Sequence, residues 1–356
     1  MDIQVGDCPA SALFRRSTFA SAKVVKILFL AGVMALISSK ALTQTPSSTP
    51  TLPAGAAAVE ARLATPAGHE VNASVGNYTY TEPGAPSISI HGAKVGGEYA
   101  ATLSLDKRRH WFAQINVRGT VGNVTYTGWC SPFLITPNRA SPNRYELDVG
   151  NASPCSENGD KDWYLEGRTL TGKDFIAQKW ALSPYTGLGL RHLSNGTTGT
   201  SGYRTDDYLY LPAGITARTM VTSHGVVSFN LEFNLLIHGW QKTRDSELGG
   251  ADVPGTMTAP PFSIDRFTDI SFSQSRGWAL RTSVKYQVTS RWSVEPYYVY
   301  WNVGASPVNY ETATFTVNDV TAREQLGAYE PLNVTHEFGV KLGFRFCGLR
   351  RLECSL

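Results

Sequence analysis

The chain contains little that would hold a metal ion or a nucleic acid. It has 356 residues but only five cysteines, with no Cys-x-x-Cys pair and no His/Cys cluster, so a structural zinc site is not expected. Lys and Arg number 32 against 29 Asp and Glu, and this near balance gives no reason to expect a nucleic-acid partner. No glycine-rich phosphate loop precedes a helix, and we predict no cofactor.

Apolar runs long enough to form a membrane-spanning helix are also missing. The run Ile27–Ile37 is shorter than the roughly 20 residues that such a helix needs. Basic residues precede it, and Ser39-Lys40-Ala41 follows with small residues at the two positions that a signal peptidase recognises. We therefore predict an export signal over residues 1–41. Residues 42–70 are rich in Thr, Pro, Ser and Ala without a sustained period, which predicts a disordered linker with no helix of ordinary length.

What the chain does contain is alternation, most clearly at His336–Phe346. The apolar residues Phe338, Val340, Leu342, Phe344 and Phe346 alternate with Gly339, Lys341, Gly343 and Arg345. Side chains on a strand alternate between faces, so this strand has one apolar face and one small or charged face. A transmembrane β-barrel strand has this pattern, with its apolar face toward lipid and its polar face toward the lumen.

The same alternation recurs along residues 71–346. The predicted strands are Val71–Tyr80, Ser87–Leu105, Trp111–Tyr126, Asp162–Gly172, Lys179–Leu193, Asp207–Arg218, Val226–Trp240, Gly277–Val288, Trp292–Val303 and the closing strand. Tight and long connections alternate between them, as the short periplasmic turns and longer external loops of outer-membrane barrels do. We predict an all-β fold, a single antiparallel transmembrane barrel of about ten strands, with eight or twelve as alternatives. A soluble β-sandwich is the competing fold, but it has no reason to alternate its connections.

The closing stretch resembles the last strand of Gram-negative outer-membrane proteins, which ends on an aromatic residue, usually Phe. The stretches Tyr185–Arg191 and Tyr208–Gly214 resemble recurrent strand segments of such porin-like barrels. The resemblance implies a location in the outer membrane, among its lipid and lipopolysaccharide. It also implies insertion by the barrel assembly machinery, which recognises the closing strand. The tail 347–356 departs from this pattern, because closing strands usually end on their aromatic residue.

The inward faces carry charges of both signs. A barrel of this size is narrow and is largely filled by side chains, so buried charges are expected to pair with one another. The predicted lumen network consists of Lys94, Glu98, Arg118, Glu166, Arg168, Arg191, Glu232, Arg281, Glu295, Glu337, Lys341 and Arg345, and the same register also turns Arg218, His238 and Lys285 inward. This favours a structural or surface role with an ion-paired lumen. The alternative is a narrow polar porin that prefers anions.

A second alternative is catalysis at Arg191–Asn195. His192 and Ser194 are two residues apart, hence on one face of a strand, and Asp206 or Asp207 could supply the acid of a triad. The string resembles the active-site stretch of outer-membrane lipid A deacylases, and the resemblance implies that Ser194 would attack an acyl ester while His192 takes its proton. We expect no enzyme activity and keep the esterase as the alternative.

Two cysteines flank the polar stretch Thr127–Lys161. A disulfide between Cys130 and Cys155 would close that loop in an oxidising periplasm. The alternative is a pair of free loop thiols.

Overall fold

The computed structural model describes residues 54–84, 87–106, 110–130, 133–137, 145–149, 153–196, 203–222, 225–255 and 260–346. The predicted signal peptide, 1–41, and the tail 347–356 lie outside these ranges. The side chains of residues 54–58, of Cys130 and of most residues in 133–149 also lie outside the description.

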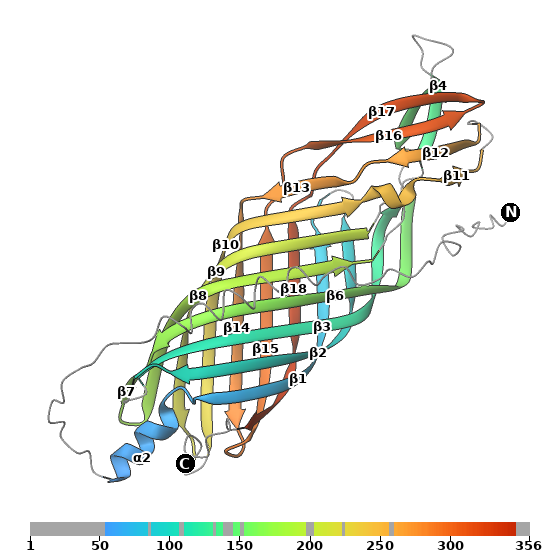
Figure 1. The fold of residues 1–356 in the computed structure, drawn as a ribbon. Coiled ribbons are helices and arrows are strands. Elements are labelled where there is room, and N and C mark those ends of the chain that lie inside the picture. The colour runs from blue at the N-terminus through green and yellow to red at the C-terminus, as the bar shows by residue number, and fades with distance from the viewer. Residues whose placement is uncertain are drawn as a thin grey trace. The chain divides into compact units, whose positions relative to one another are not determined.

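Ten strands form a closed antiparallel ring (Figure 1). In ring order they are β1 (Gly68–Glu82), β2 (Ile88–Ser104), β3 (Trp111–Cys130), β6 (Ser153–Lys173), β8 (Trp180–Asn195), β9 (Tyr203–Met220), β10 (Val226–Arg244), β14 (Gly277–Gln287), β15 (Trp292–Val303) and β18 (Asn333–Phe346). The ring closes where β1 pairs with β18, with His69 opposite Phe346 and Thr81 opposite Val334. The predicted ten-stranded barrel is confirmed.

Both ends of the barrel sequence lie at the same end of the ring, because the first residues of β1 pair with the last residues of β18. The short connections 105–110, 174–179, 221–225 and 288–291 lie at that end, and the second of them carries β7 (Phe175–Ala177). Outer-membrane barrels have short turns on the periplasmic side and longer loops outside the cell. We therefore name this the periplasmic end and the opposite one the external end.

The long connections at the external end contain strands that the sequence did not predict. β4 (Phe133–Pro137) pairs with β5 (Tyr145–Val149), and β13 (Ile270–Gln274) pairs with β10. A separate sheet has the order β11 (Ala251–Val253), β12 (Phe262–Phe267), β16 (Asn309–Val317), β17 (Val320–Ala328). A short 3-10 helix, η1, spans Asp245–Leu248. The prediction of plain loops here was wrong, because Ile264, Phe315 and Val317 are fully buried in a small core of their own.

Several strands are also longer than predicted. β3 has 20 residues, β6 has 21 and β10 has 19, whereas a tilted strand crosses a bilayer with about 9–11. The predicted strand Asp162–Gly172 therefore covers only the periplasmic half of β6. Because the turns at the periplasmic end are tight, the excess length projects from the external end (Figure 1).

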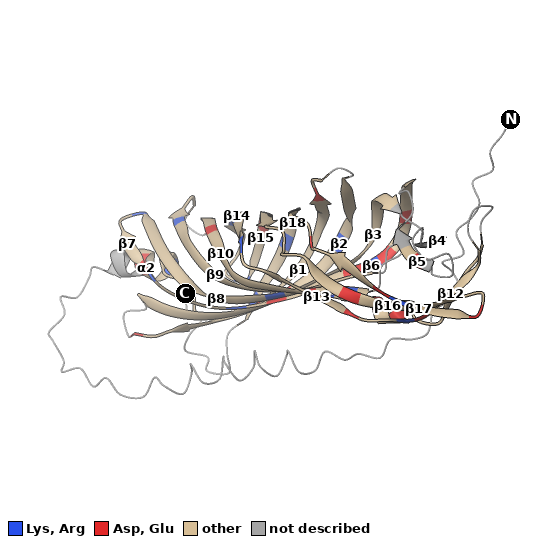
Figure 2. Ribbon diagram, turned by 90° about the horizontal axis from the view of Figure 1, so that it is seen from above, with Lys and Arg blue, Asp and Glu red and all other residues tan. Residues whose placement is uncertain are grey.

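The outward face of the ring is apolar. Val75, Leu231 and Phe338 are 58%, 52% and 59% exposed, as expected for side chains that meet lipid tails. Exposed tryptophans lie at two levels: Trp111, Trp180 and Trp292 adjoin the periplasmic turns, while Trp240 and Trp278 lie toward the external end. Two such levels are the aromatic girdles of a membrane barrel. Basic residues, drawn in blue, and acidic residues, drawn in red, both occur along the barrel strands (Figure 2).

One inward assignment was wrong. The pairing of β10 with β9 shifts by one residue between Leu236 and His238. Leu236, before the bulge, keeps the inward parity of Glu232 and Asn234, whereas His238, beyond it, lies outside, where its ring packs on that of Trp240 at 4.4 Å. A bulge adds one residue to one strand and therefore reverses the alternation beyond it.

The predicted linker 42–70 also differs from the structure over its described part. Helix α2 spans Ala54–Leu63, and β1 already begins at Gly68. Leu63 is fully buried, and the Thr65 amide and hydroxyl donate to the Asp174 carboxylate at 2.5 and 2.7 Å. The buried Leu63 side chain and the two hydrogen bonds to Asp174 therefore order a segment whose composition alone suggested disorder. Among the described residues, no helix is both long and apolar enough to span a membrane.

Candidate functional site

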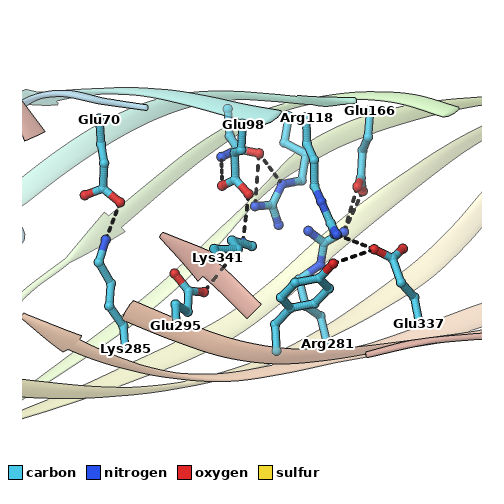
Figure 3. Close-up of polar contacts among 12 residues, drawn as sticks. Glu70, Glu98, Arg118, Glu166, Arg281, Lys285, Glu295, Glu337 and Lys341 are labelled. Atoms are coloured by element: carbon cyan, nitrogen blue, oxygen red, sulfur yellow. Dashed lines mark hydrogen bonds and ion pairs between the residues drawn. The ribbon is translucent and has the colours of Figure 1, made fainter. Parts of the chain in front are cut away.

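The centre of the lumen is occupied by a layer of charged and aromatic side chains (Figure 3). Arg118 on β3 reaches Glu337 on β18, past the two intervening strands β1 and β2. The hydroxyls of Tyr164 and Tyr297 each donate to this carboxylate at 2.8 Å. Arg118 and Glu337 are only 1% and 2% exposed, so the pair is removed from water and its partners must supply the hydrogen bonds that water would give.

A second group of ion pairs lies beside the first and also crosses the lumen. Arg281 on β14 donates to both oxygens of Glu166 on β6, at 2.7 and 2.8 Å. Arg168, also on β6, donates to both oxygens of Glu232 on β10 at 2.9 Å. Arg281 joins the two pairs, since its Nε lies 3.5 Å from Glu232. These contacts connect strands that are not neighbours in the ring, so they fill its interior.

Toward the periplasmic end the pairs continue along the wall. Lys341 lies 2.7 Å from Glu98 and 3.6 Å from Glu295. Glu70 accepts hydrogen bonds from Lys285 and, at 2.9 Å, from Arg345. Glu70 was not among the predicted network residues, although it shares the inward parity of β1 with Asn72 and Tyr78.

Two further predicted residues have different surroundings. Lys94 pairs with Asp162, a buried carboxylate that the prediction missed. Arg191 has no ion pair among the described residues; its guanidinium lies over the rings of Tyr164 and Trp301, at 4.4 and 5.2 Å from their centroids. The structure thus places all twelve predicted side chains inside the barrel and connects eleven of them by ion pairs.

An apolar and aromatic cluster occupies the lumen next to this layer, toward the external end. It comprises Tyr164, Leu193, Tyr208, Tyr210, Leu236, Ala279, Tyr297, Val299, Trp301 and Val303, all buried. Between the charged layer and the periplasmic end, by contrast, a cavity of about 670 Å³ remains. The lumen is therefore filled on one side and hollow on the other.

Three acidic side chains, Glu82, Asp206 and Glu330, lie around Arg204 at the external end. We call these four residues the mouth cluster. Arg204 on β9 lies 3.2 Å from Glu82 on β1, the strand opposite it in the ring, and 3.5 Å from Glu330. Glu330, in the connection before β18, also accepts from Tyr80 at 3.1 Å and Gln241 at 2.6 Å. Burial raises the pKa of Glu330 to about 7, with the neighbouring Glu82 adding to the effect.

The sequence analysis missed the mouth cluster because it ended the strands too early. Glu82 continues the inward parity of Tyr78 and Tyr80, and Arg204 continues that of Tyr208 and Tyr210. Extending each strand at constant parity would have found both residues. Glu330 lies outside any strand, so no periodicity could have indicated it.

The esterase candidates lie on the outer side of β8, where it pairs with β9. The Nδ1 atom of His192 lies 2.8 Å from the carboxylate of Asp207, which directly faces it, and the His192 ring packs on Trp163 at 5.2 Å. Asp206, the other candidate acid, points inward and is buried. Ser194 is fully buried and its Oγ is hydrogen-bonded to the hydroxyl of Tyr203, not to His192. His192 is therefore paired with Asp207, whereas Ser194 is hydrogen-bonded to Tyr203.

The structure bears on the predicted disulfide through one of its two cysteines. Cys155 on β6 is disulfide-bonded. The side chain of Cys130 lies outside the described residues, but its backbone on β3 pairs with Ser153, two residues from Cys155. In the part of the chain that the structure describes, no three His, Cys, Asp or Glu side chains are grouped so as to hold a metal ion.

These features define the class of protein. A closed ring of ten antiparallel strands leaves no unpaired edge, and its apolar outward face with two aromatic levels matches a lipid bilayer. The chain is an integral β-barrel protein of the outer membrane.

Solved structures of outer-membrane proteins are similar to this chain in fold, at low sequence identity. No family model matches the chain, and no curated protein sequence matches it. The outer membrane protease OmpT from Escherichia coli is similar over 87% of this chain and all of its own, with 9% identity and a TM-score of 0.46. The translocator domain of the autotransporter NalP from Neisseria meningitidis is similar over 91% of this chain and 98% of its own length, with 11% identity and a TM-score of 0.30. The attachment invasion locus protein Ail of Yersinia pestis covers 78% and 99% at 10% identity, with a TM-score of 0.23.

Proposed function

We propose that this protein is a non-conducting outer-membrane barrel with a structural or surface role. Its partners are the lipid and lipopolysaccharide around it, and the barrel assembly machinery that inserts it through the closing strand β18. The central layer of the lumen supports this proposal more than any other feature. Arg118 and Glu337 meet across the ring, and the hydroxyls of Tyr164 and Tyr297 also donate to the Glu337 carboxylate.

The energetics of that layer favour a lumen that stays closed. Removing one partner of a buried ion pair leaves an uncompensated charge and costs about 3–5 kcal/mol. An ion that crosses the barrel would have to separate several such pairs in succession, because Arg281, Arg168 and Glu232 form a connected group beside the first pair. The external strands and their small sheet then provide the surface that the protein presents outside the cell.

Single-channel recording in a planar bilayer tests the proposal. We expect the wild type to show no steady conductance, and the double variant Arg118→Ala, Glu337→Ala to show openings, because it deletes the central pair. The control is Lys242→Ala, Asp269→Ala, which removes a 2.7 Å ion pair outside the lumen and should stay silent. Large, steady, salt-dependent channels from the wild type would instead support the narrow polar porin.

The second candidate function is a lipid esterase, and the His192–Asp207 contact is the observation in its favour. An acid hydrogen-bonded to Nδ1 is the arrangement that orients a catalytic histidine. For activity the hydroxyl of Ser194 would have to leave Tyr203 and turn to His192. We expect no such activity under the preferred proposal.

Mass spectrometry of lipid A from producing cells separates the two candidates. We expect identical lipid A with the wild type, Ser194→Ala and Tyr203→Phe, the last of which frees the serine hydroxyl while keeping the ring. Loss of an acyl chain with the wild type but not with Ser194→Ala would establish the esterase and refute the structural role.

A further inference from the structure

The proposed function does not use the cavity at the periplasmic end, which we call the basal cavity. It has a volume of about 670 Å³, within the range of roughly 300–1,000 Å³ typical of small-molecule sites. Arg118, Arg168 and Arg281 form its inner end, and Lys285 and Lys341 lie along its wall. The segment that follows α2 also borders it, through Thr65 and Pro66.

The wall of this cavity carries more positive than negative charge. Its cationic residues are Arg62, Arg118, Arg168, Arg218, Arg281, Lys285, Lys341 and Arg345, and its acidic residues are Glu70, Glu98, Glu232 and Glu295. Arg281, Arg118 and Arg218 pair with carboxylates that do not line the cavity. These carboxylates are Glu166, Glu337 and Asp174. A molecule in the cavity therefore faces eight cationic side chains and four carboxylates, so the groups that can donate hydrogen bonds to an anion outnumber the carboxylates that would repel it.

Two of the arginines at the inner end have donors without a partner. Arg281 is 95% buried, being 5% exposed, and its Nη1 group makes no hydrogen bond; neither does the Nε group of Arg118, which is 1% exposed. A buried charged donor without an acceptor is unfavourable, and an acceptor supplied by a ligand removes that penalty. Guanidinium groups bind carboxylate and phosphate oxygens well because their N–H groups form a planar fork. Apolar residues such as Phe112, Leu170 and Val226 complete the wall and suit a carbon skeleton.

We propose that the basal cavity is a binding site for a small organic anion that carries carboxylate or phosphate groups and enters from the periplasm. Arg281 and Arg118 contact the anionic group at the inner end, and Lys285 contacts the part of the ligand nearer the opening. Figure 3 shows Lys285 and Glu70 on one side of the labelled residues and Arg118 and Arg281 on the other, so the cations are spread along the length of the lumen. The proposal does not depend on whether the barrel conducts.

Isothermal titration calorimetry of the folded full chain in detergent micelles tests this site. The probes are citrate and inorganic phosphate, titrated against a chloride blank of equal ionic strength. We expect saturable binding of at least one probe, weakened tenfold or more by Arg281→Gln and several-fold by Lys285→Gln. The control is Lys242→Gln, whose side chain is 49% exposed outside the lumen and should leave Kd unchanged.

The two variants keep the test decisive even if one fails to fold. Arg281 pairs with buried Glu166 and Glu232, so its variant is first checked for folding by gel mobility before and after boiling. Lys285 is 20% exposed and its partner Glu70 keeps Arg345, so its variant should fold and then carries the test alone. Absence of saturable heat with both probes, or binding that Lys285→Gln leaves unchanged, would overturn the proposal.

Discussion

The mouth cluster should make the protein less stable as the pH rises, and Glu330 is one of the residues that produce the effect. It is 1% exposed, and the cluster has three carboxylates for the single guanidinium of Arg204. Burial away from water disfavours a charged Glu330, and the neighbouring Glu82 adds to this, so the folded protein keeps Glu330 protonated to a higher pH than the unfolded chain does. Its pKa is raised from 4.5 to about 7, chiefly by burial.

The sign and size of the effect follow from that shift. Between about pH 4.5 and 7 the folded state holds a proton that the unfolded state has released, so the free energy of unfolding falls as the pH rises through this window. One pKa unit corresponds to about 1.4 kcal/mol, so this group alone should remove about 3 kcal/mol. Below the window both states are protonated and above it both are ionised, and the contribution is then constant.

Urea unfolding in detergent at a series of pH values measures this contribution. The variant Glu330→Gln keeps the shape and a hydrogen-bond acceptor but cannot ionise, so its stability relative to the wild type should improve by about 3 kcal/mol between pH 4.5 and 8. Glu247→Gln is the control, since that side chain is 47% exposed and should give a constant difference. Parallel pH profiles for the wild type and Glu330→Gln would refute the reasoning.

Three further predictions concern the barrel itself. The protein should run differently on a gel before and after boiling, because a closed ring resists detergent; equal mobility would indicate a soluble sheet. Glu337→Gln should lower the free energy of unfolding by about 3–5 kcal/mol, measured in urea, because it leaves Arg118 buried without a counter-charge, whereas Glu295→Gln, whose contact with Lys341 is 3.6 Å long, should cost far less. Digestion without reductant should yield a linked peptide pair containing Cys130 and Cys155, and separate peptides would show that Cys155 has another partner.

The period-two alternation was sufficient to predict the barrel. A residue such as Lys341 must face away from Phe338 and Val340 on the same strand, so its place in the lumen followed from parity alone. Parity cannot show where a strand ends or where a bulge lies, and for this reason Glu82 was missed and His238 was assigned to the wrong face. The small external sheet depends on contacts between segments about 50 residues apart, such as Ile264 with Phe315, and no local pattern reports those.

Parity also could not show which residues from distant segments meet at the mouth cluster and at the esterase candidates. The three acids of the mouth cluster come from β1, β9 and the connection before β18, and only the closed ring brings them together. The sequence offered Asp206 and Asp207 as alternative acids for His192, and only the register of β8 with β9 shows that Asp207 is the one opposite it. The engagement of Ser194 by Tyr203 could not be predicted either, since it depends on a side-chain conformation.

The contact between Thr65 and Asp174 has a consequence for the order of assembly. Thr65 lies just before β1, whereas Asp174 lies beyond β6, and β2 and β3 separate these strands in the ring. In a sheet that has not yet curved to join β1 to β18, the two residues stand three strand spacings apart, roughly 14 Å. Ser183 and Arg218, which hold the Asp174 carboxylate in place, belong to β8 and β9 and arrive later in the chain. We therefore expect the N-terminal helix to dock only after the sheet has curved and β8 and β9 have joined it, so that its docking is a late step of assembly.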